Sequence, residues 1–276
     1  MPSMKICFLV IIYNKDVVES TTIKSLLSIT EEDFSCCIVN NGPYSINPPN
    51  TQDFKNIDFR FLEYLENKSL SVIYNEFISH YSDADRFVIL DDDSILAPSF
   101  KDVVFSDSKD DFDLELPRIL DSNNNVHYPL KNWLPITEEV ILDYKKDVIF
   151  SIGSGLVISR NLVNKFKNKN IKLFNESFVF YGVDFSFFWN LNKNDFGDIK
   201  IFSRSEIVHD MSLHGEISEF KRSELYINFS LQARHYPSKV NMKNFLYSLI
   251  QTIKKRNLSL LFKMVKSYFI GKHPRS

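Results

Sequence analysis

A short apolar run, Phe87 to Leu90, leads directly into three consecutive aspartates, Asp91, Asp92 and Asp93. The apolar run predicts a buried strand, and in an open parallel sheet ligands bind beyond the carboxyl ends of the strands. Side chains alternate along an extended chain, so Asp91 and Asp93 should face one side and Asp92 the other. Two carboxylates on one side suit Mg²⁺ or Mn²⁺. The alternative is a solvated turn, since aspartate is a common turn residue.

The first hundred residues alternate between strand and helix patterns, with β-branched and aromatic runs separated by helically spaced apolar positions. The expected strands are 5–13, 36–39, 58–64 and 87–91, and the expected helices begin near residues 14 and 69. This order predicts an α/β fold with a mainly parallel sheet flanked by helices. The chain contains neither a Gly-x-Gly-x-x-Gly run nor a phosphate-loop motif, which argues against an ordinary dinucleotide or ATP site.

The second hundred residues are less regular. Strands are expected at 113–120, 147–159 and 199–202, short helices at 161–169 and 185–191, and an irregular stretch at 121–148. Gly153-Ser154-Gly155 interrupts the second of these strands, where small side chains let a ligand or another backbone approach, although the step could be only a bulge. Asp184 opens the aromatic helix, where it could act as a general base or simply cap the helix.

The charge is divided along the chain. The net charge of −2 combines −12 over residues 1–224 with +10 after Glu224, where no Asp or Glu follows. Two amphipathic stretches lie in this basic region, around residues 245–253 and 258–269. They predict a helical appendage over 225–276 that binds an anionic membrane surface; the alternative is a helical hairpin that packs on the body with solvated lysines. A basic stripe with interleaved aromatics is missing from the acidic body, so no nucleic acid is expected as a partner.

The compartment is expected to be cytoplasmic. The N-terminus does not read as a signal peptide, and no apolar run reaches the length of a membrane span. The three cysteines, Cys7, Cys36 and Cys37, lie within strand-like runs and are expected to be reduced core residues. Together with the basic C-terminal region, these features predict a peripheral protein on the inner face of the cell membrane. The oligomeric state is left open.

Taken in order, several short motifs resemble those of the inverting glycosyltransferases of family 2, which have the GT-A fold, and in particular the rhamnosyltransferase-like branch that builds bacterial surface polysaccharides. The segments that carry the likeness are Tyr13-Asn14, Val39-Asn40-Asn41-Gly42, the run from Asn67 to Asn75, Leu90-Asp91-Asp92-Asp93-Ser94, Ile152-Gly153-Ser154-Gly155-Leu156 and Val183-Asp184. Leu90-Asp91-Asp92-Asp93-Ser94 is similar to the family's Asp-x-Asp metal motif, and the resemblance rests on the order and spacing of all these segments together. Two positions depart from the family pattern: Asn40 stands where an Asp is usual, and Ser69 where a Gly is usual.

The resemblance implies a role for each matched position. The nucleotide donor would meet Tyr13, Asn14, Asn40, Asn41, Asn67, Asn75, Asp91 and Asp92. The metal ion, Mg²⁺ or Mn²⁺, would be held by Asp93, Asp91 and a late histidine, for which His209 is the first candidate and His214 the second. Asp184 would be the catalytic base. Gly153, Ser154, Gly155 and Trp133 would lie on the acceptor side, although Trp133 could equally be a core residue.

The resemblance also implies an activity and a division of the chain. Residues 1–224 would form the GT-A domain, with a nucleotide-binding half at 1–100 and an acceptor half at 101–224. The protein would be a metal-dependent inverting glycosyltransferase that moves a sugar from dTDP-rhamnose or a UDP-sugar to a lipid-linked or growing surface polysaccharide, such as an O-antigen or capsule. Two alternatives remain: a metal-dependent nucleotidyltransferase, and a non-catalytic membrane-associated subunit for glycan assembly.

Overall fold

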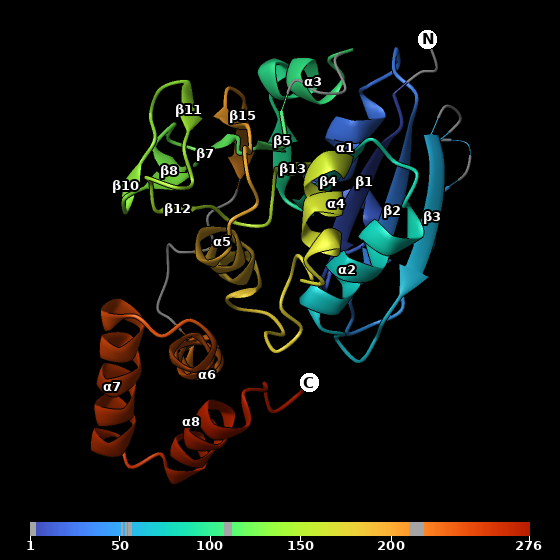
Figure 1. The fold of residues 1–276 in the computed structure, drawn as a ribbon. Helices are drawn as coiled ribbons and strands as arrows, with labels where there is room; N and C mark the ends of the chain where they lie inside the picture. The colour runs from blue at the N-terminus through green and yellow to red at the C-terminus, as the bar shows by residue number, and fades with distance from the viewer. Residues whose placement is uncertain (1–3, 51, 53, 55–56, 108–111, 210–217) are drawn as a thin grey trace.

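The computed structural model describes residues 4–50, 52, 54, 57–107, 112–209 and 218–276 (Figure 1). An eight-stranded sheet forms its centre, with the strand order β11-β14-β6-β13-β4-β1-β2-β3. These strands are β1 (Ile6–Ile12), β2 (Phe34–Asn40), β3 (Ile57–Glu63), β4 (Arg86–Asp91), β6 (Leu114–Glu115), β11 (Val140–Leu142), β13 (Leu156–Ser159) and β14 (Ile201–Ser203).

The four strands from the first hundred residues pair in parallel, as the sequence predicts. The other half of the sheet is mixed, because β13 runs antiparallel to both β4 and β6, while β14 pairs with β6 in parallel. The expectation of one strand over 113–120 is wrong: β6 ends at Glu115, and β7 (Arg118–Leu120) belongs to another sheet. The expected strand over 147–159 is likewise split into β12 (Ile149–Phe150) and β13.

Two smaller sheets extend the structure beside β13. One has the order β5-β15-β7-β8, and it contains β5 (Ser94–Leu96), β8 (Val126–Tyr128) and β15 (Glu206–His209). The other has the order β10-β9-β12, with β9 (Leu130–Lys131) and β10 (Leu134–Pro135). Because β5 follows directly after β4, the first of these small sheets begins at the acidic turn, and β15 brings His209 opposite Ser94.

Helices cover both faces of the central sheet (Figure 1). They are η1 (Val17–Glu19), α1 (Thr21–Leu27), α2 (Leu70–His80), α3 (Pro98–Val104), α4 (Arg160–Asn168) and α5 (Val183–Lys193). Alternate residues of β1 point into different cores: Leu9 packs with residues of α2, α4 and α5, whereas Phe8 packs with residues of α1 and α3. A strand buried on both faces is therefore apolar at every position, which is why β1 reads as a continuous run. The expected fold class, a helix-flanked sheet with C-terminal helices, is confirmed.

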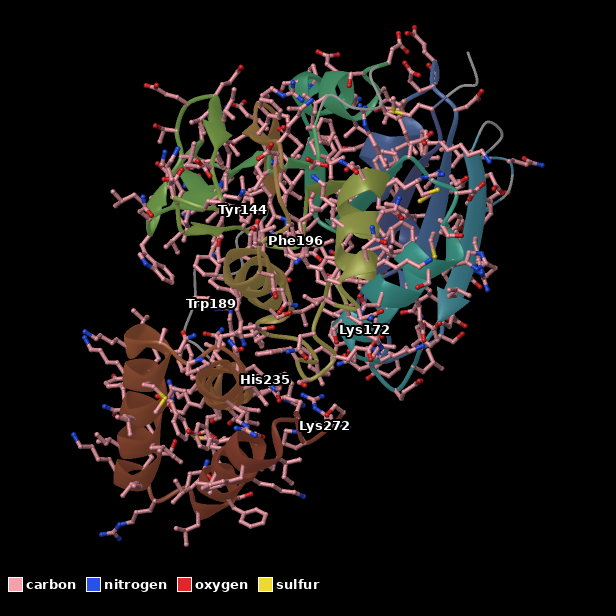
Figure 2. All side chains as sticks on the ribbon, in the orientation of Figure 1. Tyr144, Lys172, Trp189, Phe196, His235 and Lys272 are labelled. Atoms are coloured by element: carbon pink, nitrogen blue, oxygen red, sulfur yellow. The ribbon has the colours of Figure 1, made fainter. Side chains whose placement is uncertain are left out.

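Three further helices, α6 (Glu219–His235), α7 (Lys239–Lys254) and α8 (Leu258–Ile270), form a bundle next to α5 (Figure 1). The charge distribution predicts a boundary between residues 224 and 225, but helix α6 spans it. The helical region of the structure therefore begins before that boundary. The bundle meets α5 where Trp189 stacks on Tyr236, with ring centroids 6.1 Å apart, near His235 (Figure 2). No described helix combines the length and apolar character needed to cross a bilayer.

The last residues of the chain return to the body. The backbone N–H of His273 donates to the carbonyl of Ser177 at 3.1 Å. The buried carboxylate of Glu224 on α6 lies 3.1 Å from His273 Nε2 and 2.8 Å from Arg275 Nη2. Burial raises the pKa of Glu224, but His273 and Arg275 outweigh it, so the pKa lies below the ordinary value. Glu224 therefore ties the C-terminal segment to α6, as a charged group.

We expect Glu224→Gln to lower the free energy of unfolding at pH 7 by about 2 kcal/mol, since it removes charge-assisted contacts at a buried position. A carboxylate with a lowered folded-state pKa stabilises the fold above its unfolded pKa, and loses that contribution as the pH falls through the folded value. The difference between variant and wild type should therefore shrink in acid. Urea denaturation at several pH values measures it, with Glu139→Gln at an exposed position as control. A difference that stays constant down to pH 3 would contradict the assignment.

Candidate functional site

The aspartates after β4 alternate in direction, as predicted. Asp91 and Asp93 face His209: Asp93 Oδ1 lies 3.0 Å from His209 Nδ1, and Asp91 Oδ2 lies 4.0 Å from His209 Nε2. Asp92 points the other way, where it accepts a hydrogen bond from the backbone N–H of Tyr13 at 3.2 Å and pairs with Lys15 Nζ at 2.7 Å. The sequence reasoning did not single out Lys15. Two of the three carboxylates therefore face His209, and the third faces Lys15 and the end of β1.

The side chain of Ser154 contacts the backbone of this acidic turn. Its buried hydroxyl accepts a hydrogen bond from the backbone N–H of Asp91 at 3.0 Å and lies 2.9 Å from the hydroxyl of Ser94. The Ser94 hydroxyl in turn lies 3.1 Å from His209 Nδ1. Ser154 therefore lies between the acidic turn and the histidine, and its expected role on the acceptor side stays a prediction.

The donor set on the Asp91 side fits a divalent cation. Within the described part of the chain, no three His, Cys, Asp or Glu side chains form a complete metal site. Asp93 Oδ1 is nevertheless buried, and it lies 3.0 Å from His209 Nδ1 without a well-directed hydrogen bond among the described residues, so it keeps a lone pair that a cation could use. Two carboxylates and an imidazole are ligands that Mg²⁺ and Mn²⁺ accept, with the remaining positions filled by water or phosphate. Burial raises the pKa of Asp91 to about 6, with the Asp93 and Asp92 charges adding to the rise and His209 opposing it.

Asp184 lies near the start of α5, and two glycines shape its surroundings. The backbone N–H of Gly153 lies close enough to the Asp184 carboxylate to lower its pKa, and a Cβ atom at Gly153 would lie only 3.1 Å from Asp184 Oδ1. Gly182 caps α5 with φ of +82°, and a Cβ there would lie 2.0 Å from Asn228 Oδ1 of α6. Burial, followed by the charge of Asp91, raises the pKa of Asp184 to about 7. A carboxyl group with such a pKa can take up a proton near neutral pH.

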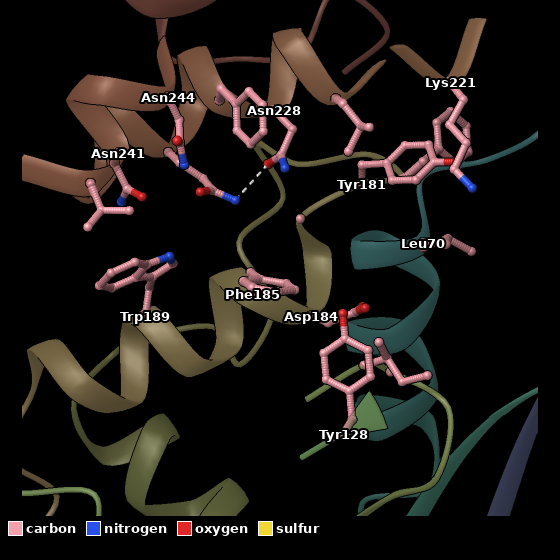
Figure 3. Close-up of a pocket in the computed structure, with 18 of the residues that line it drawn as sticks. Leu70, Tyr128, Tyr181, Asp184, Phe185, Trp189, Lys221, Asn228, Asn241 and Asn244 are labelled. Atoms are coloured by element: carbon pink, nitrogen blue, oxygen red, sulfur yellow. Dashed lines mark hydrogen bonds between the residues drawn. The ribbon is translucent and has the colours of Figure 1, made fainter. Parts of the chain in front are cut away.

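One pocket of about 620 Å³ brings these groups together. Asp91, Asp184, His209 and Gly153 line it, as does Trp133, which stacks on Phe150 with ring centroids 4.9 Å apart. The other lining residues come mostly from α5, α6 and α7, and they include Tyr128, Tyr181, Phe185, Trp189, Lys221, Asn228, Gln232, Asn241 and Asn244 (Figure 3). The sequence reasoning missed these residues. The signal available was the set of amide side chains within otherwise apolar helix faces.

Of the residues predicted to bind the nucleotide, Asp91 lines this pocket. The others are not among its lining residues, and several of them make hydrogen bonds within the protein. Tyr13 and Asn14 lie beside Asp92 at the end of β1. Asn40 donates to the Tyr44 carbonyl and to Glu63.

Two later donor candidates, Asn41 and Asn67, lie in loops, and a third, Asn75, lies on α2. Asn41 donates to Asn67 Oδ1, and Asn75 donates to the carbonyl of Phe174 and accepts from its N–H. Asn75 therefore fixes the loop before α5. Gly155, with φ of +92°, lies in the turn that enters β13. His214 lies outside the described residues.

No protein-family model matches this sequence, and no curated protein matches it. Several solved structures share its fold. Residues 1–349 of S. aureus TarS, in complex with UDP-GlcNAc, align with a TM-score of 0.56 at 12% identity, over 99% of this chain and 93% of that one. A longer form of TarS aligns with a TM-score of 0.54 and 12% identity over 96% of this chain, which spans 55% of its length. GalNAc-T7 with UDP, GalNAc and Mn²⁺ aligns with a TM-score of 0.54 and 13% identity, over 85% and 49%.

The shared fold is GT-A-like, as the sequence resemblance implies. At such low identity the likeness concerns the fold alone, and the rhamnosyltransferase-like branch stays a prediction.

The two directions of the aspartates give a test of the metal site. We expect wild-type protein to bind Mn²⁺, and Asp93→Asn to lose binding by at least about tenfold, because a carboxylate ligand is removed. Asp92→Asn is the matched control, since its carboxylate faces Lys15 and should leave Mn²⁺ affinity within about twofold. Electron paramagnetic resonance of free Mn²⁺ measures both. Equal losses in the two variants would mean that the turn binds no cation in the proposed way.

Proposed function

We propose that the protein is a metal-dependent glycosyltransferase that moves a sugar from a nucleotide diphosphate donor to a glycan acceptor. The observation that carries this proposal is that the cation-competent turn and the carboxyl group of Asp184 line the same pocket. The GT-A-like fold supports it, as do the UDP-GlcNAc, UDP and Mn²⁺ with which the similar structures are in complex. Those ligands favour a UDP-sugar among the expected donors, with dTDP-rhamnose as the alternative.

In the proposed reaction, Asp184 acts on the acceptor. Its carboxylate takes the proton of an acceptor hydroxyl while that oxygen bonds to the anomeric carbon of the donor sugar. The bond between this carbon and the diphosphate oxygen breaks, and the nucleoside diphosphate leaves. A cation held by Asp93, Asp91 and His209 would stabilise the negative charge on the departing diphosphate. Burial raises the pKa of Asp184 towards neutrality, and the nearby backbone N–H of Gly153 limits that rise. A single displacement inverts the configuration at the anomeric carbon, so the proposed reaction is inverting.

The proposed acceptor is lipid-linked, and the proposed location is the inner face of the cell membrane. Helices α7 and α8 support this placement, because they expose large apolar side chains next to basic ones. The exposed apolar residues are Leu246, Tyr247, Ile250, Ile253, Leu258, Phe262, Val265, Phe269 and Ile270. Lys254, Lys255 and Arg256 form a basic turn between the two helices. Such a combination matches an interfacial membrane helix pair that meets anionic headgroups.

The function is tested by thermal shift with UDP, dTDP, GDP and CMP, each with and without Mn²⁺. A ligand that binds only the folded state raises the melting temperature with its concentration. We expect one diphosphate to stabilise wild-type protein, and the stabilisation to require both Mn²⁺ and Asp93. The same protein should release that diphosphate from its sugar conjugate. Binding of a nucleoside triphosphate with release of pyrophosphate from a sugar phosphate would instead favour the nucleotidyltransferase.

Asp184→Asn separates the base from the donor site. We expect sugar transfer or donor hydrolysis to fall by about 10²–10⁴-fold, because the proton acceptor is lost, while the diphosphate still binds in the thermal-shift assay. Wild-type activity should rise with pH through about 7, since Asp184 acts only when it is deprotonated. An unchanged rate in Asp184→Asn would exclude the assigned role, and unchanged rates in both Asp93→Ala and Asp184→Ala would favour the non-catalytic subunit.

Membrane binding is tested by co-sedimentation with vesicles of phosphatidylcholine, with or without phosphatidylglycerol. We expect binding that depends on the anionic lipid. A triple reversal of Lys254, Lys255 and Arg256 to Glu should weaken it by on the order of a hundredfold, at roughly 1 kcal/mol per basic residue. The matched control reverses three exposed lysines of the body, Lys24, Lys167 and Lys193. Equal losses in the two variants would show a general charge effect and contradict the docking surface.

A further inference from the structure

The pocket continues well beyond the groups used in the proposed reaction. Asn241, Asn244 and Trp189 lie at one end in Figure 3, and Asp184 and Tyr128 lie toward the other. Helices α5, α6 and α7 build the first end, which we call the amide arm: Trp189, Asn228, Gln232, Asn241 and Asn244. Neither the metal ligands nor the proton transfer requires these residues. We therefore ask which ligand, other than the metal and the reacting groups, the amide arm could bind.

The chemistry of the amide arm is polar but uncharged. Each carboxamide offers two N–H donors and a carbonyl acceptor. Gln232 Nε2 donates to Asn228 Oδ1 at 3.2 Å, and Asn241 Nδ2 donates to the Tyr236 carbonyl at 2.7 Å, so two of the amides are held in place by the bundle. Sugar hydroxyls also act as both donor and acceptor. An amide wall therefore pairs with them without requiring a charge on the ligand.

Two side chains of the arm offer groups that the protein itself leaves available. The indole Nε1 of Trp189 is buried and makes no hydrogen bond within the described part of the chain. Asn244 is half-buried, and its carboxamide has no hydrogen-bond partner among the described residues. Unpaired buried polar groups are costly unless a ligand or water satisfies them. Their position beside aromatic faces, including Phe185, suits a sugar ring, which presents C–H groups on its faces and hydroxyls at its edge.

The distribution of charge excludes other occupants. Among the described lining residues, the acidic ones, Asp91 and Asp184, lie outside the amide arm, and an acidic sugar would face their negative potential. A polyprenyl chain would bury the carboxamides without hydrogen bonds, which costs free energy. A nucleoside diphosphate would need cations, and the described residues of the arm supply none.

We propose that the amide arm binds a neutral sugar unit of the acceptor, so that the C-terminal bundle forms half of the acceptor site. This inference rests on the proposed function, since it concerns the second substrate of the same pocket. The unit in the arm precedes the unit whose hydroxyl reaches Asp184. The bundle is thus part of the substrate-binding surface, and its amides select an uncharged glycan.

Intrinsic fluorescence gives a direct readout, because both tryptophans of the chain, Trp133 and Trp189, line this pocket. The titrants are the methyl glycosides of glucose, galactose, N-acetylglucosamine and rhamnose, with methyl glucuronide and methyl galacturonide as acidic counterparts. Farnesol is the apolar probe. We expect at least one neutral glycoside to change tryptophan emission in wild-type protein, and to bind more tightly than its acidic counterpart.

The variant Asn244→Leu keeps the size of the side chain and removes its hydrogen bonds, so affinity for the neutral glycoside should fall about tenfold. Gln251→Leu, further along α7 and outside the pocket, is the matched control and should bind as wild type does. If Asn244→Leu does not fold, Trp189→Phe removes the indole N–H donor while keeping an aromatic ring at the position, and Trp133 remains as the reporter. The expected loss is of similar size.

Tighter binding of farnesol or of the acidic glycosides would overturn the inference, as would unchanged neutral-glycoside affinity in both pocket variants. The absence of any glycoside response in wild-type protein would overturn it as well. The proposed function is judged separately, by the Mn²⁺-dependent diphosphate shift of the same wild-type protein. A diphosphate shift without glycoside binding rejects only the amide arm. Glycoside binding without a diphosphate shift would reject the proposed donor site, and the protein would then be interpreted as a glycan-binding protein.

Discussion

The pairing of β13 with β4 is the constraint on which the candidate site depends. The two strands run antiparallel, with Leu156 opposite Ile89, and the N–H of Gly155 donates to the Ile89 carbonyl at 2.7 Å. This register brings Ser154 against the backbone of Asp91 and sets Gly153 beside Asp184. A slip by one residue would turn every side chain of β13 to the other face. The distance between the acidic turn and the candidate base is therefore fixed by backbone pairing rather than by flexible side chains.

The parallel half of the sheet was predictable, because its signals are local. Each of its strands is an apolar run long enough to be recognised, and the alternation of Asp91, Asp92 and Asp93 follows from the pleat alone. The mixed half was not predictable in the same way. Strand β6 of this half contains two residues, as does β12 of a small neighbouring sheet, and both are held by partners distant in sequence. A two-residue strand has no periodicity to read, so the sequence suggested longer strands than the structure contains.

The candidate site shows the same division between local and distant signals. The aspartates and Asp184 stand out in the sequence because carboxylates at the ends of apolar segments are unusual. Asn228 and Asn244 do not stand out, since isolated amides on a helix are ordinary until the packing of α6 against Gly182 places them in a pocket. Ser154 shows the opposite case. The Gly153-Ser154-Gly155 step is visible in the sequence, but only the strand register reveals that the Ser154 hydroxyl supports the acidic turn.

The C-terminal segment links the bundle to the pocket through one buried charge. Glu224 binds the returning segment through His273 and Arg275, and His273 also reaches the loop that precedes α5. Four residues further along α6, Asn228 packs against Gly182, which begins the helix that carries Asp184. A movement of α7 and α8 relative to the central sheet would therefore be transmitted through α6 to the start of α5, close to Asp184. If α7 and α8 lie on a membrane, the surface that positions the protein and the surface that receives the acceptor belong to one packed unit, so docking and acceptor geometry are coupled by construction.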